Sequence, residues 1–582
     1  MIHHYLAATG ISGLAPAIPP ELDRELGRRG LGPRWRSPAL VLYATDDLPL
    51  RFLPGDRGIV VGRLFDGGAE AAPDRVPRTL SHEDCDRFVV QLWGSYVAIE
   101  AANGELRVLR DPMGSLGCYH AEAGGLHYVT SVPHLLIDCG LIAGELDWSV
   151  IAGALTDRRA RTSATALRDV EELPAGALLT VGRQSRAAVQ VWDPARLALG
   201  GRRGRPAADL AQALDSSLTA WASCAARPLV EVSGGLDSAI VAAGIAAVSP
   251  RASLITFSAA PGDPDETAYA RALARHLALP LAIAAPRIED VDLARSAAAD
   301  LPRPNARSFT QATDALSADH GRKIAADAFV SGGGGDDVFC YQRSVLPAID
   351  RFHADGWRAA LTTAYDIAVM NHSTLWQALH RIVRRLLAGG AGGARPDTRF
   401  LSSAVAAPAD RAEPERRALL PGKADHVRGI VSIRNYLEGH GRSELAPVIS
   451  PLLSQPVVEC CLAIPSWAWC EGGRNRAVAR AAFADRLPRM LVERRSKGAF
   501  DGFCARLLAS QRRRAREILL DGTLAREGLI DRSAVAAALA DPFPRAEIVT
   551  RLLWLVDVEA WLGSWTGRQR PWAWRRARAR QR

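Results

Sequence analysis

Two patterns of hydrophobic and polar positions divide the sequence. Up to about residue 195, short apolar segments with alternating polar positions are broken by Gly, Pro and Asp, as in 58–65, 87–101, 104–114 and 124–131. Such alternation between turn residues predicts β-strands and hairpins. We therefore expect a mostly β domain over residues 1–195, followed by a linker from Arg196 that is rich in glycine and arginine.

From about residue 205, predicted strands and helices alternate. Strands are predicted at 228–232, 253–258, 279–284 and 327–331, and helices at 209–225, 239–248 and 265–277. This alternation predicts a parallel sheet covered by helices on both faces. Beyond about residue 340 the pattern is mainly helical. The predicted fold is thus a mostly β domain followed by an α/β domain, residues 205–582, with a largely helical C-terminal part.

Composition and charge add little to this picture. The chain has 582 residues, of which 48% are hydrophobic and 23% charged, as is ordinary for a globular protein. Lys and Arg exceed Asp and Glu by 72 to 63, and the tail 567–582 is basic without an acid. That tail is typical either of a solvated terminus or of contact with an acidic partner or nucleic acid. We favour the terminus, and so expect no nucleic-acid partner.

The nine cysteines are scattered, and no pair has CxxC spacing, so no zinc site is predicted. An odd number of cysteines without a secretory signal favours reduced thiols and a cytoplasmic protein. No apolar run approaches the roughly 18 residues that span a bilayer. The segment 552–565 is interrupted by Asp557 and Glu559, so we expect a buried amphipathic helix and no membrane partner.

A glycine-rich turn, SGGLDS at Ser233–Ser238, lies between a predicted strand and a predicted helix. Glycines let the backbone approach a ligand, and the amides at a helix start attract anions, so this turn predicts phosphate binding. It lacks the spacing and the lysine of a Walker A loop. Asp237 would repel phosphates unless a divalent cation such as Mg²⁺ lay between them. The alternative is a surface turn with a helix cap.

A second glycine turn, VSGGGGDDVF at Val330–Phe339, follows the predicted strand 327–331 and ends in Asp336 and Asp337. A turn at a strand end could supply a second carboxylate to the same Mg²⁺, because ligands bind at the carboxyl ends of parallel strands. The alternative is a flexible glycine linker.

Together these motifs resemble the ATP-pyrophosphatase superfamily and, within it, the asparagine synthetase and β-lactam synthetase group. Further similar segments follow in order at 256–277, 331–339, 450–459 and 487–500. The resemblance implies a PP-loop ATP-pyrophosphatase α/β domain that uses ATP and Mg²⁺ to form a carbon–nitrogen bond and releases AMP.

The resemblance also assigns roles to residues. Asp237 and Asp336 would bind Mg²⁺, and Lys497 would stabilise the charge that develops at the adenylate. These three would be the catalytic residues. The residues that bind ATP or its pyrophosphate would be Val232, Ser233, Gly234, Gly235, Leu236, Asp237, Ser238, Phe257, Ser258, Gly332 and Lys497. Phe257 and Ser258 would lie near the adenine. Without the resemblance, the basic run around Lys497 would favour a solvated lysine.

The segment 92–136 resembles the glutamine amidotransferase domain of the same group, which has an Ntn-type fold. Its nucleophile is a cysteine at the mature N-terminus. This sequence starts with Met1, and its first cysteine is Cys85. We therefore expect a degenerate class II amidotransferase-like domain without glutaminase activity, so that the amine comes from the substrate itself or from a separate molecule.

Two departures from the group's motifs indicate a branch. Gly333 stands where β-lactam synthetases have the tyrosine that forms part of their base, and Ser454 replaces an aspartate. The chain is most similar to the lasso peptide macrolactam synthetases. This implies an enzyme that adenylates an Asp or Glu side chain of a ribosomally made peptide and closes it onto the N-terminal amine, with the helical region 340–440 as the peptide cradle.

Partners implied by that resemblance are the precursor core peptide, a leader-binding protein and a leader peptidase. The alternatives are an amidating enzyme that uses free ammonia or a small amine, and a β-lactam synthetase-like cyclase of small molecules. A scaffold pseudo-enzyme would have lost the acids, yet Asp237 and Asp336 are present. A tRNA-modifying ligase is disfavoured by the amidotransferase-like domain.

Overall fold

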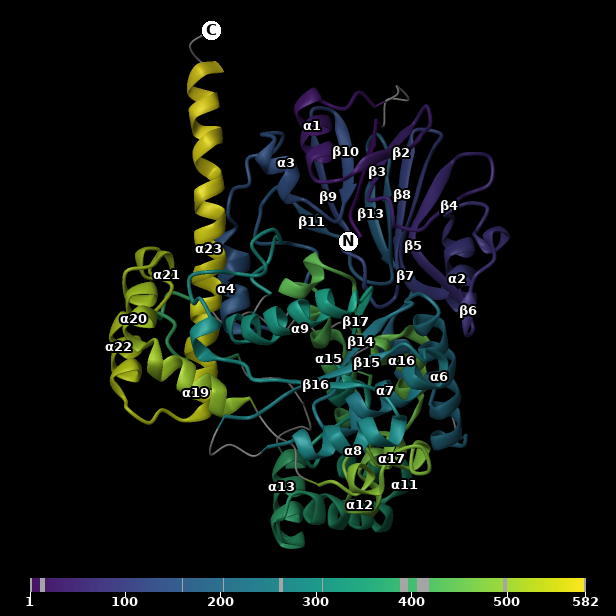
Figure 1. Cartoon of the computed structure of the whole chain (residues 1–582), viewed down its shortest axis with the longest axis vertical. Helices are drawn as coiled ribbons and strands as arrows, with labels where there is room; N and C mark the ends of the chain where they lie inside the picture. Colours follow the sequence, from purple (N-terminus) through teal and green to yellow (C-terminus); the bar gives the residue numbers. More distant parts are fainter. Residues whose placement is uncertain are drawn as a thin grey trace.

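The computed structural model describes residues 3–10, 16–159, 161–201, 204–260, 265–305, 307–387, 396–405, 418–495 and 500–579. These residues form two antiparallel sheets, one parallel sheet and a helical C-terminal part (Figure 1). The predicted fold class is confirmed.

The N-terminal part is a sandwich of two antiparallel sheets. The first has the order β11-β9-β10-β1-β3-β2, with β1 Tyr5–Thr9, β2 Gly32–Arg36, β3 Leu40–Ala44, β9 Tyr119–Ala123, β10 Leu126–Thr130 and β11 Glu171–Glu172. The second has the order β13-β12-β8-β7-β5-β4, with β6 beside β5: β4 Leu50–Phe52, β5 Gly58–Asp66, β6 Ala69–Glu70, β7 Trp93–Ala102, β8 Glu105–Arg110, β12 Ala177–Val181 and β13 Arg186–Gln190.

Apolar side chains fill the space between these sheets. Tyr5 and Leu42 of the first sheet share one buried cluster with Val61, Ile99 and Val108 of the second. Helices cover the outer faces: α1 (Pro20–Arg28) and α3 (His134–Asp138) lie on the first sheet, and α2 (His82–Gln91) lies on the second. The strands therefore alternate between an inner core and a helix-covered face.

One predicted strand is partly wrong. The segment 87–101 was expected to be extended, but residues up to Gln91 belong to α2 and the strand β7 begins at Trp93. Ser81 caps this helix, since its hydroxyl accepts the Asp84 amide at 3.1 Å. Phe88 packs edge-on against Tyr96, with ring centroids 5.3 Å apart. The cap and this contact between helix and sheet outweigh the β propensity of the valines.

The parallel sheet has the order β16-β15-β14-β17-β18. Its strands are β14 Pro228–Glu231, β15 Ser253–Phe257, β16 Leu281–Ala284, β17 Ala328–Ser331 and β18 Val448–Ile449. Four of them were predicted; β18, with two residues, is too short to leave a pattern. Helices around it are α5 Pro194–Leu199, α6 Pro206–Ala222, α7 Leu236–Val248, α8 Thr267–Leu277, α9 Gln311–Ile324 and α16 Gln455–Ala463. Apolar clusters lie on both faces of this sheet, as expected.

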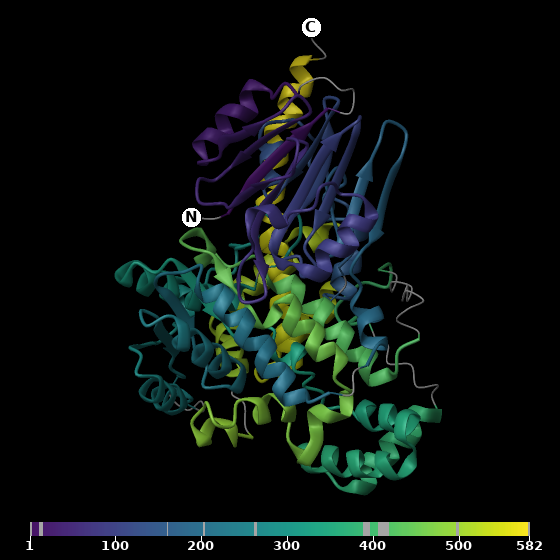
Figure 2. The same ribbon diagram turned by 90° about the vertical axis from the view of Figure 1, so that its right-hand side faces the viewer.

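The remaining helices form two groups. Below the parallel sheet lie α11 Leu346–Asp355, α12 Trp357–Met370, α13 Leu375–Leu387 and α17 Ala477–Ala482, and α15 Pro421–Ile433 lies beside the sheet (Figures 1 and 2). The short helices α10 Gly335–Val338 and α18 Arg489–Val492 belong to the same part of the chain. At the side of the molecule lie α4 Trp148–Thr156, α19 Asp501–Ser510, α20 Arg512–Leu520, α21 Thr523–Arg526, α22 Arg532–Ala540 and α23 Ala546–Ala579.

The predicted helix 552–565 is part of α23, and its large apolar side chains are buried, among them Leu552, Trp561 and Trp565. Asp557, which interrupts the apolar run, is buried as well, and its carboxylate accepts a hydrogen bond from the Ser308 amide at 2.8 Å. No helix within the described ranges is both long and apolar enough to cross a membrane.

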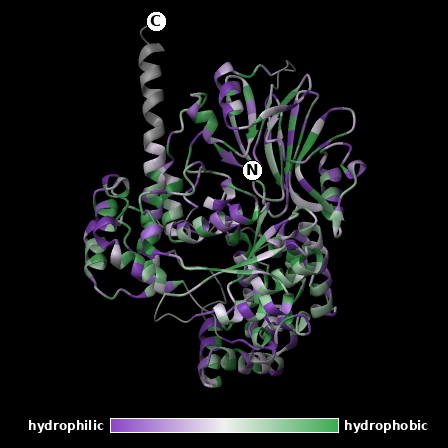
Figure 3. Ribbon diagram, in the orientation of Figure 1, coloured by the Kyte–Doolittle hydropathy of each residue, from purple (hydrophilic) through white to green (hydrophobic). Residues whose placement is uncertain are grey.

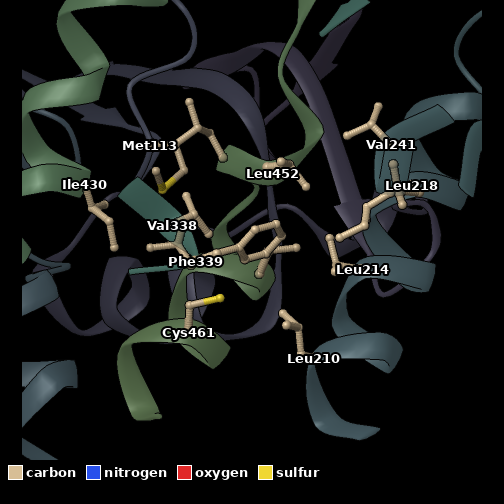
Figure 4. Close-up of a cluster of buried hydrophobic side chains, with 14 of the residues drawn as sticks. Met113, Leu210, Leu214, Leu218, Val241, Val338, Phe339, Ile430, Leu452 and Cys461 are labelled. Atoms are coloured by element: carbon tan, nitrogen blue, oxygen red, sulfur yellow. The ribbon is translucent and has the colours of Figure 1, made fainter. Parts of the chain in front are cut away.

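The β sandwich and the α/β part share one apolar core. Met113 of the sandwich packs in a buried cluster with Val338, Phe339, Leu452 and Cys461 of the α/β part (Figure 4). The antiparallel strands end at Gln190 and α6 begins at Pro206, beside the predicted boundary at 195–205. The division into two domains stays a prediction.

Candidate active site

The two glycine turns leave neighbouring strands at the same edge of the parallel sheet. Strand β14 pairs with β17 in parallel register, Glu231 opposite Ser331, and each turn follows directly. Strand β15 pairs with β14 on its other side, so Phe257 also ends at this edge. The sheet thus brings together the two turns that the sequence separates by about a hundred residues, which is where ligands bind in such folds.

Glycine is required where the turns meet. A Cβ added to Gly335 would lie 2.5 Å from the Cβ of Asp237, and one added to Gly332 would lie 2.7 Å from the Cα of Ser238. Gly234 and Gly334 have φ of +70° and +86°, which other residues rarely adopt. The glycines therefore serve to bring the backbone of one turn against the side chain of the other.

The side chains of Asp237 and Asp336 both accept hydrogen bonds from the guanidinium of Arg476. Arg476 Nη1 donates to Asp237 Oδ2 at 2.7 Å and to Asp336 Oδ1 at 2.9 Å. The two carboxylate oxygens are therefore no more than 5.6 Å apart, the combined length of the two contacts. The Asp237 side chain is 12% exposed and that of Asp336 38%. Two acids held on one positive charge are placed to share a metal ion.

This pair fits Mg²⁺ that arrives with a nucleotide. Mg²⁺ is commonly held by one or two carboxylates, the remaining ligands being phosphate oxygens and water. Among the described residues, no group of three or more His, Cys, Asp or Glu side chains could hold a metal ion without a nucleotide. Asp237 and Asp336 would be the protein ligands, with Arg476 moving aside or turning to the phosphates.

A cavity of about 270 Å³ lies between the two turns. It is lined by the predicted site residues Ser233, Gly235, Asp237, Ser238, Gly332 and Asp336, and by Glu231, Ser331, Gly333, Gly334, Gly335, Asp337 and Ile433. The hydroxyl of Ser238 accepts the Ser233 amide at 3.2 Å, which holds the first turn closed. The cavity floor is thus made of glycine backbone and hydroxyls, a surface suited to phosphate.

The other predicted site residues lie around this cavity. Val232 and Leu236 are buried in the apolar core, so only their backbone groups face the turn. The Gly234 carbonyl accepts a hydrogen bond from Arg494 at 2.6 Å. Phe257 and Ser258 lie at the end of the neighbouring strand, outside the residues that line the cavity. Their place near adenine stays a prediction.

Lys497 falls outside the described residues, which end at 495 and resume at 500. Its predicted role stays a prediction.

Three charged residues of the site were missed by the sequence interpretation. Arg476 has φ of 54° and lies over the ring of Tyr341, 5.0 Å from its centroid. Arg494 lies 4.2 Å from the centroid of Tyr269 and holds the first turn through Gly234. Glu231 enters the cavity from the end of β14 and pairs with Arg442 at 2.9 Å. Only Arg494 had a signal, the basic run beside Lys497.

Positive charge is concentrated beside Asp237. The pKa of Arg480 is lowered to about 10, first by its burial and second by the positive charge of Arg476. Arg480 is fixed there by hydrogen bonds to the carbonyls of Asn475 and Val492 at 2.7 and 2.5 Å. A buried cation that lacks enough negative charge around it favours the binding of an anion. Arg480 therefore adds positive charge near Asp237, although it does not line the cavity between the turns.

A second cavity of about 310 Å³ lies between the β sandwich and the α/β part. It is lined by His3, His4 and Gly117 on the sandwich side and by Cys224, Glu438, Ser450, Leu453 and Ser454 on the other, among further residues. Ser450 lines this interdomain cavity, and its hydroxyl is 3.6 Å from where a Gly333 Cβ would be, so Ser450 lies close to both cavities.

One of three comparisons with known proteins identifies a family. The asparagine synthase family matches residues 209–563. No curated protein matches the sequence significantly. Among solved structures, the glutamine phosphoribosylpyrophosphate amidotransferase of B. subtilis with ADP and GMP is 10% identical, with a TM-score of 0.21, and covers 56% of this chain and 90% of its own. The allosteric regulatory enzyme of purine biosynthesis is 11% identical, with a TM-score of 0.20, and covers 57% and 83%.

The family match spans more than half of the chain and includes both glycine turns, the residues that meet at Arg476 and the strands that carry them. The chain belongs to the asparagine synthase family.

Proposed function

We propose that this chain is an ATP-dependent macrolactam synthetase. It would activate an Asp or Glu side chain of a peptide and join it to the N-terminal amine of the same peptide, with AMP and pyrophosphate released. Membership of the asparagine synthase family supports ATP-dependent amide-bond ligase activity, with ATP and normally Mg²⁺ as cofactors. The observation that carries the proposal is the placement of Asp237 and Asp336 on one guanidinium nitrogen.

In the first step, a carboxylate oxygen of the peptide attacks the α-phosphorus of ATP, and the bond to the β-phosphate oxygen breaks. Amides and hydroxyls of Ser233 and Ser238 hold the leaving pyrophosphate, and Arg476 and Arg480 balance its charge. Mg²⁺ held by Asp237 and Asp336 would offset the remaining phosphate charge.

In the second step, the peptide amine attacks the acyl carbon of the adenylate, loses a proton and expels AMP. Lys497, a predicted residue of this step, would stabilise the oxyanion. Binding the amine and the adenylate in one molecule makes the reaction intramolecular, which lowers its entropic cost by several kcal/mol.

The absence of a side chain at Gly333 is an argument for a bulky substrate. A Cβ there would meet Ser331 Oγ at 3.4 Å and Ser450 Oγ at 3.6 Å, which are ordinary contacts, and its φ is not positive. The fold therefore does not demand glycine at this position, unlike Gly335. The missing side chain leaves open the part of the cavity that a folded peptide would enter.

We also propose that glutaminase activity is absent. Burial raises the pKa of Cys85 to about 12, so its thiolate is not formed at neutral pH. Burial also raises the pKa of Cys224, the cysteine that lines the interdomain cavity. A thiol kept protonated is a poor nucleophile. The amine then comes from the substrate itself or from a separate molecule.

A second candidate is an amidating enzyme that uses ammonia or a small amine. The interdomain cavity favours it, because that cavity reaches Ser450 beside Gly333 and is wide enough for a small molecule. A β-lactam synthetase-like reaction has less support, since Gly333 cannot supply a base.

Mass spectrometry separates these functions. The protein would be incubated with ATP, Mg²⁺ and a peptide freed of its leader, and separately with small acids and ammonia. Loss of one water from the peptide with release of AMP supports ring closure. If the peptide is adenylated and then only hydrolysed, also after a leader-binding protein and leader peptidase are added, the macrolactam proposal is wrong. Amide formation with small acids and ammonia would support the second candidate.

A further inference from the structure

Exposed apolar side chains are concentrated on the helices below the parallel sheet. The described residues expose 16 large apolar side chains, and seven of them lie between Phe352 and Leu387. Single exposed apolar residues are normal, but a cluster of them marks an interaction site. Helices α12 and α13 carry six of these seven at the lower end of the molecule, away from the β sandwich (Figures 1 and 2).

These six side chains, together with three exposed arginines, define the hairpin surface: Trp357, Leu361 and Tyr365 of α12, Trp376, Val383 and Leu387 of α13, and Arg358, Arg381 and Arg384. The apolar residues are spaced by four on α12 and by seven and four on α13, so each set lies on one side of its helix. Trp376 is 80% exposed and Leu387 83%.

The hairpin surface is distinct from the faces that hold the helices in the fold. Ala364 and Ile367 of α12 and Ile382 of α13 lie in a separate buried cluster with Ile349 of α11. Each helix therefore has an inner apolar face that is already packed and an outer apolar stripe that is exposed. Packing within the folded chain explains the inner apolar faces, but it does not explain the exposed apolar stripes.

The charge of the hairpin surface is positive. No ion pair within the described residues involves Arg358, Arg381 or Arg384. Asp366 is the one acid in the sequence of these two helices, and it is buried. The aromatic and arginine side chains of such a surface are the types enriched where proteins bind each other. A partner that neutralises this surface is acidic.

We infer that the hairpin surface docks an acidic polypeptide helix that has one apolar face and Asp or Glu side chains elsewhere. An anionic membrane is the other surface of matching charge. It fits less well, because a helix that lies in a membrane surface needs its main apolar face free. Here the main apolar face of α13 is packed inward, and Arg384 flanks the outer stripe. The inference does not rest on the proposed macrolactam activity.

The hairpin surface is also connected to the active site. Asn371, in the turn between α12 and α13, donates to the carbonyl of Arg343 at 2.8 Å. Arg343 donates to the hydroxyl of Tyr341 at 3.0 Å, and Arg476 lies over the Tyr341 ring. The turn between α12 and α13 is thus hydrogen-bonded to the segment that follows the second glycine turn and α10.

Fluorescence anisotropy with the full chain tests this site. The probe is a labelled helical peptide with leucine at positions i, i+3, i+4 and i+7 and glutamate elsewhere; the matched probe has lysine in place of glutamate. We expect the glutamate peptide to bind more tightly, and the affinity to fall as salt is raised. The double variant Trp376→Ser/Val383→Ser should weaken binding about tenfold or more.

The matched control is Val90→Ser/Phe543→Ser, which changes two side chains that are 83% and 90% exposed elsewhere. It should leave binding unchanged. Arg381→Glu/Arg384→Glu should reverse the preference toward the lysine peptide. Equal binding of both probes, or equal loss in the control variant, overturns the inference. Binding of phosphatidylglycerol vesicles but not of the peptide, or self-association that the double variant abolishes, also overturns it.

Discussion

Asp237 and Asp336 share one nitrogen of Arg476, at 2.7 and 2.9 Å, although they belong to turns on different strands. The first turn offers one carboxylate, Asp237, and the Asp337 carboxylate of the second turn lies against Gly429, so each turn places one carboxylate at Arg476. The parallel pairing of β14 and β17 supplies the second carboxylate, because it ends both strands at the same level. The cation site therefore depends on the sheet as much as on either motif.

Replacing either acid should stop adenylation. For Asp237→Asn and Asp336→Asn we expect AMP release and ATP–pyrophosphate exchange to fall on the order of 10²-fold or more, because a lost metal ligand removes several kcal/mol of charge stabilisation. Asp337→Asn is the matched control: it lies in the same turn, but its carboxylate lies against Gly429. Equal activity of Asp237→Asn and the wild type would refute the metal assignment.

Arg476 should compete with the metal for the two acids. In Arg476→Met the carboxylates lose their shared cation, so we expect a lower melting temperature without Mg²⁺. Added Mg²⁺ should then raise the melting temperature of this variant more than that of the wild type, because the ion replaces the lost charge. Thermal melts with and without Mg²⁺ measure both effects.

Arg480→Met serves as the control for that experiment, since Arg480 binds the carbonyls of Asn475 and Val492 and contacts neither carboxylate directly within the described hydrogen bonds. A Mg²⁺ response equal in both variants would show that Arg476 does not occupy the metal position.

The sequence predicted the two glycine turns and their carboxylates, because each lies directly after a short apolar strand and leaves a local pattern. Arg476 could not be predicted this way. It is 239 residues from Asp237, follows no strand and adopts a backbone conformation that is rare for arginine. A contact that depends on how distant helices pack has no signature in local periodicity.

The same reason explains the errors in the fold. The helix α2 depends on the Ser81 cap and on the packing of Phe88 against Tyr96, while the valines nearby favour a strand. Strand β18 exists only because Val448 and Ile449 pair with the edge of β17. Hydropathy alone, coloured on the ribbon in Figure 3, shows apolar residues throughout both parts and does not separate such cases.

Asp557 should make stability depend on pH. Burial raises the pKa of this α23 carboxyl to about 7, while the Ser308 amide partly opposes the shift. The folded chain therefore binds this proton more tightly than the unfolded chain, so its contribution to stability is largest below about pH 4 and is lost as the pH rises to about 7. Asp557→Asn keeps an acceptor for the Ser308 amide and has no charge to bury.

We expect Asp557→Asn to be more stable than the wild type at pH 8, by on the order of 3 kcal/mol, and nearly equal to it near pH 4. Urea unfolding of both proteins at several pH values measures the difference directly. A difference independent of pH would mean that the wild-type carboxyl is not protonated in the folded chain.

Two glycines of the second turn should respond in opposite ways to the same substitution. In Gly335→Ala the new methyl group would lie 2.5 Å from the Asp237 Cβ, so one turn must move away from the other and the two carboxylates separate. In Gly333→Ala the nearest atoms are hydroxyl oxygens at 3.4 and 3.6 Å, and nothing needs to move. We expect ATP–pyrophosphate exchange to be lost in the first variant and kept in the second.

Gly333→Tyr should keep the fold and the exchange with a small acid, but block ring closure of a peptide, because its ring would occupy the open part of the cavity. Loss of exchange in Gly333→Ala, or full activity in Gly335→Ala, would show that the close approach of the two turns does not position the metal ligands.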